Sequence, residues 1–200
     1  MTRAVILDAA QRLFERHGYP ATTMDAIAAE AGVALKTVYL AFTTKARLLR
    51  ALWDLLLKGD QDMAPVATRP WYRAVIEERD PERKLRLVAA GSVTVKKRIG
   101  GILRVIRSGA PVDPDTAELW ALIQSDFYAN QRAILESLPP GSLRDGLDVD
   151  TAADILWTLN HPDVWLLLSG ERGWAPERFE HWFGDTVVNQ LLRTPAAQCP

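Results

Sequence analysis

The sequence predicts an all-α protein of about nine helices, in which a small N-terminal helix-turn-helix domain precedes a larger helical bundle. Apolar residues recur at three- and four-residue spacing in almost every segment, and no stretch alternates convincingly as a strand. Glycine and proline separate these periodic segments. A chain of 200 residues that is 48% hydrophobic and 24% charged has the composition of an ordinary globular protein with one or two domains.

Two short helices are expected at the N-terminus. Residues 6–14 place their apolar side chains on one face, and Gly18 then stops this first helix. Thr22, with Asp25 three residues later, is typical of a capping box that starts a second helix, and Gly32 ends it.

Two further helices complete the first part of the chain. The pattern predicts a short helix over 35–42 and a longer one that Thr44 caps and that runs to about Gly59. The polar, proline-containing segment that follows has the composition of a joint. We therefore expect a domain over 1–58 and a second domain over 59–200.

The second domain reads as a bundle of longer helices. A stripe of apolar residues from about residue 80 to 106 predicts a long amphipathic helix, and another helix is expected over 119–138. The last two are expected over 150–169 and 176–193. Pro162 removes a helix donor and clashes with the preceding turn, so the first of these two should break there.

Charge is distributed unevenly along the chain. The formal net charge is only −1, but residues 1–58 carry +3, residues 59–107 carry +5 and residues 108–200 carry −9. Such a polarised chain is compatible with a basic end that faces nucleic acid. The same pattern arises when charges merely coat solvated helix faces, and we interpret the cations of the long helix, which include Lys84 and Lys96, in that way.

The segment AGVALKTVYLAF has the features of a helix-turn-helix corner. Ala28 is small enough for two helices to cross closely, and Gly32 can adopt the left-handed turn conformation. With Val38 and Phe42 assigned to the core, the outer face of the second helix can enter a DNA major groove about 12 Å wide. That face consists of Leu35, Lys36, Thr37, Tyr39 and Leu40. Lys45, at the start of the next helix, is placed to meet a phosphate.

These positions lie in a longer pattern, GYPATTMDAIAAEAGVALKTVYLAFTTKARLLRAL, which covers Gly18 to Leu52. The pattern resembles the N-terminal DNA-binding domain of the TetR/AcrR family of transcriptional repressors. The resemblance implies a homodimer of all-α subunits and a ligand-holding C-terminal domain. It also implies DNA contacts from Thr22 or Thr23 and from Lys36, Thr37, Tyr39 and Lys45. Leu40 departs from the polar or aromatic residues that members often have there, and it could touch a thymine methyl group.

Candidate effector and dimer contacts follow in the second domain. Asn130 and His161 are polar residues on apolar helix faces, and buried polar groups need partners, of which a ligand is one and a freed backbone carbonyl another. The expected effector site comprises Trp120, Phe127, Asn130, Trp157 and His161. The resemblance places dimerisation on the last two long helices, with Trp165, Phe179, Trp182, Phe183, Val187 and Leu191 as contacts.

Other classes of protein have little support in the sequence. There is no glycine-rich phosphate loop, no nucleophile elbow and no metal-ligand spacing, and the single cysteine, Cys199, lies next to the end of the chain. The N-terminal residues do not resemble a signal peptide, and no run of 18 apolar residues occurs. We expect a cytoplasmic protein that is not an enzyme and uses no metal or cofactor.

These observations predict a dimeric DNA-binding transcriptional regulator, namely a repressor that an apolar or aromatic small molecule releases from a palindromic double-stranded DNA operator. Two alternatives stay open. One is a DNA-binding protein of the same fold without an effector, and the other is a helical enzyme.

Overall fold

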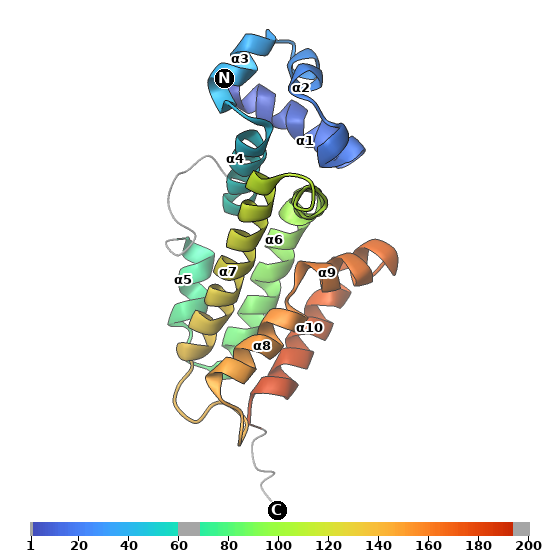
Figure 1. The fold of residues 1–200 in the computed structure, drawn as a ribbon. Helices are drawn as coiled ribbons and strands as arrows, with labels where there is room; N and C mark the ends of the chain where they lie inside the picture. The colour runs from blue at the N-terminus through green and yellow to red at the C-terminus, as the bar shows by residue number, and fades with distance from the viewer. Residues whose placement is uncertain (1, 60–68, 194–200) are drawn as a thin grey trace, which may run out of the picture. The chain divides into compact units, whose positions relative to one another are not determined.

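The computed structural model describes residues 2–59 and 69–193, and these residues form ten α-helices, α1 to α10, and one π-helical turn, η2 (Figure 1). The predicted all-α class is confirmed. The described part of the chain contains no strand, only an isolated bridge between Leu143 and Leu192. None of its helices is both long enough and apolar enough to cross a bilayer.

Backbone contacts divide the chain into two compact units. The first unit holds the described residues of Met1–Asp62 together with Arg98–Gln124, and the second holds those of Met63–Lys97 together with Ser125–Pro200. The functional boundary between residues 58 and 59 stays a prediction.

The first unit begins with four helices. These are α1 (Thr2–Ala21), α2 (Met24–Ala31), α3 (Leu35–Phe42) and α4 (Lys45–Lys58). Gly18 interrupts α1 with φ 76° and ψ 172°, so the predicted break at this glycine is confirmed. Thr44 caps α4 as predicted, because its side chain accepts a hydrogen bond from the Arg47 amide.

The cap of α2 differs from the prediction by one residue. Thr23, not Thr22, is the N-cap, and its Oγ1 accepts from the Ala26 amide at 3.1 Å. Thr22 is 2% exposed, and its hydroxyl donates to the Gly18 carbonyl at 2.8 Å. Thr22 therefore packs inward against the end of α1, and Thr23 is left to cap α2.

The remaining helices are longer on average. They are α5 (Pro70–Glu77), α6 (Pro81–Gly109), α7 (Pro114–Glu136), α8 (Val149–Leu159), α9 (Pro162–Trp165), η2 (Leu166–Glu171) and α10 (Pro176–Leu191). The predicted break at Pro162 is confirmed: α8 ends with Asn160 as its C-cap, and His161 caps α9 by accepting from the Asp163 amide. Helix α5 was not predicted, and the π-helical turn η2 replaces the expected continuation of α8 to residue 169.

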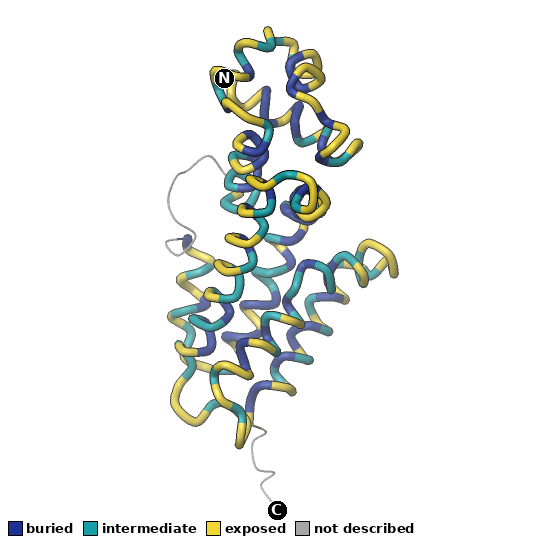
Figure 2. The backbone as a smooth tube through the Cα atoms, viewed as in Figure 1, coloured by how far each residue is buried: buried dark blue, intermediate teal, exposed yellow. Residues whose placement is uncertain are grey.

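The core of the second unit lies among these helices. Figure 2 colours the backbone by burial: buried residues lie mainly where these helices face one another, and exposed residues lie on the outer turns and loops. The completely buried members are Leu85 of α6, Ala152, Ala153 and Leu156 of α8, and Phe179, Phe183, Val187 and Leu191 of α10.

Candidate nucleic-acid interface and effector region

The corner between α2 and α3 depends on the backbone of one glycine. Gly32 has φ 65° and ψ 33°, and its amide donates to the carbonyls of Ala28 and Ala29. The next amide, that of Val33, donates to the Ala28 carbonyl at 3.0 Å. A Cβ on Gly32 would meet nothing within 4 Å, so the left-handed conformation, and not lack of space, favours glycine here.

Helix α3 is braced from beneath, as predicted. Val38 is 0% exposed, and Ala28 and Phe42 are each 4% exposed, which confirms their assignment to the core. Arg3 of α1 adds a second brace at the C-terminal end of α3. Its Nη1 donates to the Ala41 carbonyl at 3.0 Å, and its Cζ lies 4.2 Å from the centroid of the Phe42 ring.

The opposite face of α3 is open to solvent. Leu40 is 78% exposed and Tyr39 is 47% exposed, and Lys36 is exposed as well. Leu35 and Thr37 are half-buried. Within the described residues, no hydrogen bond or ion pair engages the side chains of Lys36 and Tyr39. An ammonium, a phenol and a large apolar group therefore lie together on the exposed face of a helix whose other face is buried.

Lys45 and Thr22 were predicted to contact DNA, and both make internal contacts within the DNA-binding head, which consists of helices α1 to α4. The Lys45 Nζ donates to the carbonyls of Tyr19 at 2.8 Å and Thr22 at 2.9 Å, and it lies 4.1 Å from the centroid of the Tyr19 ring. Partial burial lowers the pKa of Lys45. The Thr22 hydroxyl is buried and donates to Gly18. The geometry favours structural roles for both side chains, and their contact with DNA stays a prediction.

Tyr19 links the break in α1 to the start of α7. Its hydroxyl donates to Asp113 Oδ2 at 2.8 Å, and burial is the main reason why the pKa of Tyr19 is raised to about 12. A Cβ placed on Gly109 would lie 2.8 Å from the Tyr19 ring, so only glycine fits opposite it. Lys45, Tyr19 and Asp113 thus form one polar cluster inside the first unit.

The end of α3 holds the only residue other than glycine with positive φ among the described residues. Thr43 has φ 58° and ψ −53°, and the Thr44 amide donates to the Phe42 carbonyl at 2.5 Å across it, as in a γ-turn. A β-branched residue in this conformation is strained. The strain occurs where the chain passes from α3 into α4.

The second unit brings three predicted effector residues together. The ring centroids of Trp157 and His161 are 5.0 Å apart, and those of Phe127 and His161 are 6.3 Å apart, both in edge-on geometry. Asn130 has an internal partner, since its Oδ1 accepts from the Tyr72 hydroxyl at 3.2 Å. Trp120 belongs to the first unit and is not part of this aromatic trio of Phe127, Trp157 and His161.

Next to the trio lies a buried polar network that was not predicted. Lys96 of α6 is 4% exposed, and its Nζ donates to Ser92 Oγ and to Asn160 Oδ1, each at 2.5 Å. Asn160 Nδ2 in turn donates to Gln131 Oε1 at 3.0 Å. Burial lowers the pKa of Lys96 to about 7. The interpretation of Lys84 and Lys96 as solvated cations is wrong, because both side chains are buried.

The predicted dimer contacts lie largely inside the protomer. Phe179, Phe183, Val187 and Leu191 are each 0% exposed and Trp165 is 8% exposed. Such side chains fill the protomer's own core and have almost no area left to bury against a second copy. Of the predicted set, Trp182 alone keeps partial exposure.

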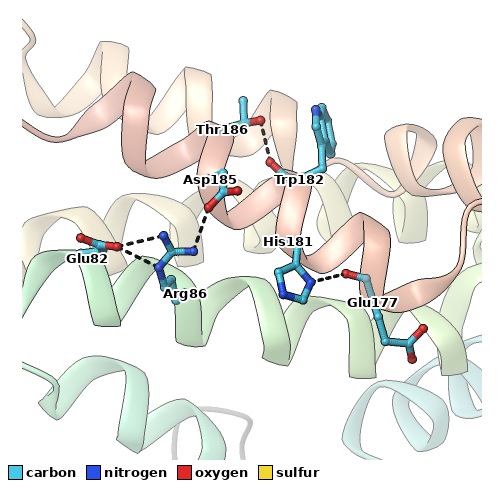
Figure 3. Close-up of polar contacts among 7 residues, drawn as sticks. All are labelled: Glu82, Arg86, Glu177, His181, Trp182, Asp185 and Thr186. Atoms are coloured by element: carbon cyan, nitrogen blue, oxygen red, sulfur yellow. Dashed lines mark hydrogen bonds and ion pairs between the residues drawn. The ribbon is translucent and has the colours of Figure 1, made fainter.

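Polar side chains at the protein surface connect α10 to α6. Arg86 donates to Glu82 and to Asp185, each at 2.9 Å, and therefore links α6 to α10 (Figure 3). One turn away, His181 Nδ1 lies 2.7 Å from the Glu177 carbonyl, and Thr186 Oγ1 donates to the Trp182 carbonyl at 2.6 Å. No cluster of three or more metal-ligating side chains occurs in the residues that the structure describes.

Known proteins resemble this chain along its whole length. Residues 6–52 match the family model of bacterial regulatory proteins of the tetR family. The HTH-type transcriptional regulator TtgR of Pseudomonas putida is 28% identical over 204 residues, which cover 98% of this chain and 93% of TtgR. Residues 6–52 therefore form an N-terminal domain of the tetR family of bacterial regulatory proteins.

Two solved structures of TetR-type repressors share the fold. SmeT, the repressor of the Stenotrophomonas maltophilia pump SmeDEF, aligns in its triclosan complex with a TM-score of 0.76 and 21% identity, over 100% of this chain and 97% of SmeT. NalD, the secondary repressor of the MexAB-OprM multidrug efflux pump in Pseudomonas aeruginosa, aligns with a TM-score of 0.70 and 22% identity, over 96% of this chain and 97% of NalD. TetR-family regulators bind DNA and form dimers, and they are not enzymes.

Proposed function

We propose that this protein is a dimeric repressor that binds a palindromic operator through α3 and is released by a small-molecule effector. One observation supports the proposal that α3 binds DNA. Lys36, Tyr39 and Leu40 are exposed together on a helix whose other face is fixed by buried Val38 and Phe42. Side chains that are exposed and not engaged elsewhere can bind a phosphate or a base edge without breaking an internal contact.

Each side chain of this face has a distinct part in the proposal. Lys36 supplies a cation for phosphate and Tyr39 a hydroxyl, and these contacts fix the register of the helix. Leu40 contacts a thymine methyl group, so operator preference depends on it. Thr23, Leu35 and Thr37 flank this face. Thr22 and Lys45 support the head from within, through their contacts with the Gly18, Tyr19 and Thr22 carbonyls.

Dimerisation supplies two heads, whose spacing must match one helical turn of DNA or a multiple of it. We place the interface on the outer surfaces of α8 and α10, where Trp182 keeps partial exposure. As a DNA-binding regulator the protein acts in the cytoplasm.

The effector is proposed to bind in the second unit near Phe127, Trp157 and His161. Two of the structural neighbours are repressors of efflux pumps, and one of them, SmeT, was solved in complex with triclosan. An effector that binds better to a conformation with wrongly spaced heads lowers operator affinity, and a coupling of about 1–3 kcal/mol is enough for roughly 5- to 150-fold release.

A mobility-shift titration on palindromes from the region upstream of the protein's own gene tests DNA binding. The wild-type chain and Arg16→Ala should both give a specific shift, because Arg16 is an exposed cation on α1, away from α3. Lys36→Ala and Tyr39→Ala should each weaken the shift by about tenfold or more. An equal loss in all three variants, or no specific shift of the wild type, would contradict the proposal.

A DNA-binding protein of the same fold without an effector is the alternative. It predicts a shift that no small molecule changes. Repeating the titration with triclosan, and with a set of aromatic compounds, decides between the two.

A further inference from the structure

Lys96 is a buried cation whose hydrogen-bond partners are neutral. Its two acceptors are Ser92 Oγ and Asn160 Oδ1, and no ion pair in the described part of the chain includes it. The rings of Phe179 and Phe183 lie 5.1 and 5.2 Å from its Nζ and add only a weak attraction. A cation that is taken out of water in this way destabilises the fold unless an anion compensates it.

Lys84, another buried lysine of α6, has a full set of hydrogen-bond acceptors and serves as a comparison for Lys96. The Lys84 Nζ donates to the Ile76 carbonyl, the Ser137 carbonyl and the Ser137 hydroxyl, at 3.1, 2.9 and 2.6 Å. Ile76 lies in the last turn of α5 and Ser137 directly follows α7, so Lys84 meets the negative ends of two helix dipoles. The partners of Lys96 are instead two neutral side chains, Ser92 within α6 and Asn160 at the C-terminal end of α8.

The Lys96 network and the aromatic trio come from the same stretches of helix. Phe127 lies four residues before Gln131, whose Nε2 donates to the Phe127 carbonyl, and Trp157 lies three residues before Asn160. Residues three and four apart share one face of a helix, so the trio and the network are neighbours on α7 and α8. The buried Trp157 Nε1 has no hydrogen-bond partner within the described residues.

We propose that the effector carries an acidic group on an aromatic or apolar body, with the anion paired to Lys96 and the body against Phe127, Trp157 and His161. This inference rests on the proposed function, since it names the chemical class of the same effector. The carboxylate supplies the charge that the neutral partners of Lys96 do not, and an acceptor atom on the ligand can take the Trp157 N–H. The asparagine and serine oxygens then hold the ammonium in place.

A matched pair of probes tests the charge. 2-Naphthylacetate and 2-naphthylacetamide have the same aromatic body and differ in whether the head group is anionic. Isothermal titration of each into the full chain without DNA, at pH 7, should show that the acetate binds at least about tenfold more tightly, because losing one partner of a buried charge pair is expensive.

Three variants test whether Lys96 is the residue that causes the preference for the acetate. Lys96→Met keeps the side-chain volume and removes the charge, and Lys96→Gln is also neutral but keeps a donor for Ser92 and Asn160. Both should abolish the preference for the acetate. Lys97→Met is the control, since it removes the same charge from the neighbouring exposed position of α6 and should leave the preference unchanged. Thermal melts confirm that each variant is folded.

The proposal is overturned if the acetate does not bind at millimolar concentration, if both probes bind equally, or if the preference survives in both Lys96 variants. The operator titration without any probe is measured separately. If the wild type shows no preference for the acetate but gives a normal DNA shift, only the effector class is refuted. If the wild type gives no specific DNA shift, the proposed function itself is refuted.

Discussion

Three lysines of this chain look alike in sequence and have different tasks in the structure. Lys45 joins the Tyr19 and Thr22 carbonyls within the head, Lys84 lies on the carbonyls at two helix ends, and Lys96 lies among neutral side chains in the second unit. Lys36, in contrast, is exposed on α3. Removing each side chain should therefore change a different property.

Lys84→Met should lower the free energy of unfolding by about 1–3 kcal/mol, because it leaves buried oxygens of Ile76 and Ser137 without a donor. Urea titration followed by far-UV circular dichroism measures this change. Arg83→Met, one residue earlier and exposed, is the matched control and should change stability by less than about 0.5 kcal/mol.

Lys96→Met should have the opposite effect near neutral pH. The folded-state pKa of Lys96 is about 7, below the ordinary value of 10.5, so the unfolded chain binds a proton that the folded chain lacks between these values. The unfolding free energy of the wild type should therefore rise with pH from about 7 to about 9, with a contribution from this lysine of up to about 1.4 kcal/mol per pH unit.

The variant lacks this contribution. Burial lowers the pKa of Lys45 and Lys84 as well, so the informative quantity is the difference between wild type and Lys96→Met. Urea titrations at pH 7, 8 and 9 measure it. A difference that does not change with pH would show that Lys96 does not titrate in this range.

The positions of these lysines could be predicted only in part from the sequence. The sequence predicts an apolar stripe on the long helix, and Lys96 is buried on it, four residues after Ser92 and three before Ile99. Helical spacing marks Lys96 as inward-facing. Its charge, however, favours an exposed position. The buried partner that accepts its hydrogen bond, Asn160, is 64 residues away in the sequence.

The ends of the helices could be predicted from the sequence more reliably than the positions of the buried lysines. The breaks at Gly18 and Pro162, the cap at Thr44 and the turn at Gly32 each depend on one residue and its immediate neighbours, and the structure confirms them. Helix α5 and the π-helical turn η2 were missed, because short elements depend on what packs against them. The inward face of α10 was predicted as a stripe, but sequence alone did not distinguish the protomer's core from a dimer interface.

The end of α3 offers a test of strain. Thr43→Gly should raise the free energy of unfolding by about 1 kcal/mol, because glycine adopts φ 58° without a Cβ clash. For a chain of this length we expect a rise of roughly 2–4 °C in the melting temperature. Thr44→Gly, which instead removes the N-cap of α4, should lower it, and an equal response of both variants in a thermal melt would show that Thr43 is not strained.

The corner offers the converse test. Gly32→Ala should destabilise the head by about 1–2 kcal/mol, although space for the methyl group exists, because the left-handed conformation disfavours alanine. Hydrogen exchange of the α2 and α3 amides reports this change locally. Protection equal to that of the wild type would contradict it.

In the whole molecule, the proposed DNA-binding face and the proposed effector region lie in different units. The head presents Lys36, Tyr39 and Leu40, and the second unit holds an aromatic trio beside a buried cation. If one molecule links DNA binding to effector binding, the coupling must be reciprocal. An effector that weakens operator binding tenfold must itself bind tenfold more weakly to the protein on its operator, and titration of the same compound with and without operator checks this equality.

The salt dependence of operator binding shows whether α3 is the surface that reads DNA. The measurement is the slope of log K against log salt concentration, determined by fluorescence anisotropy for the wild type, Lys36→Ala and Arg16→Ala. We predict that Lys36→Ala reduces the magnitude of the slope by about 1, because one phosphate contact is lost, and that Arg16→Ala leaves it unchanged. An unchanged slope for Lys36→Ala, or equal slopes for the two variants, would contradict the assignment of α3 as the DNA-binding helix.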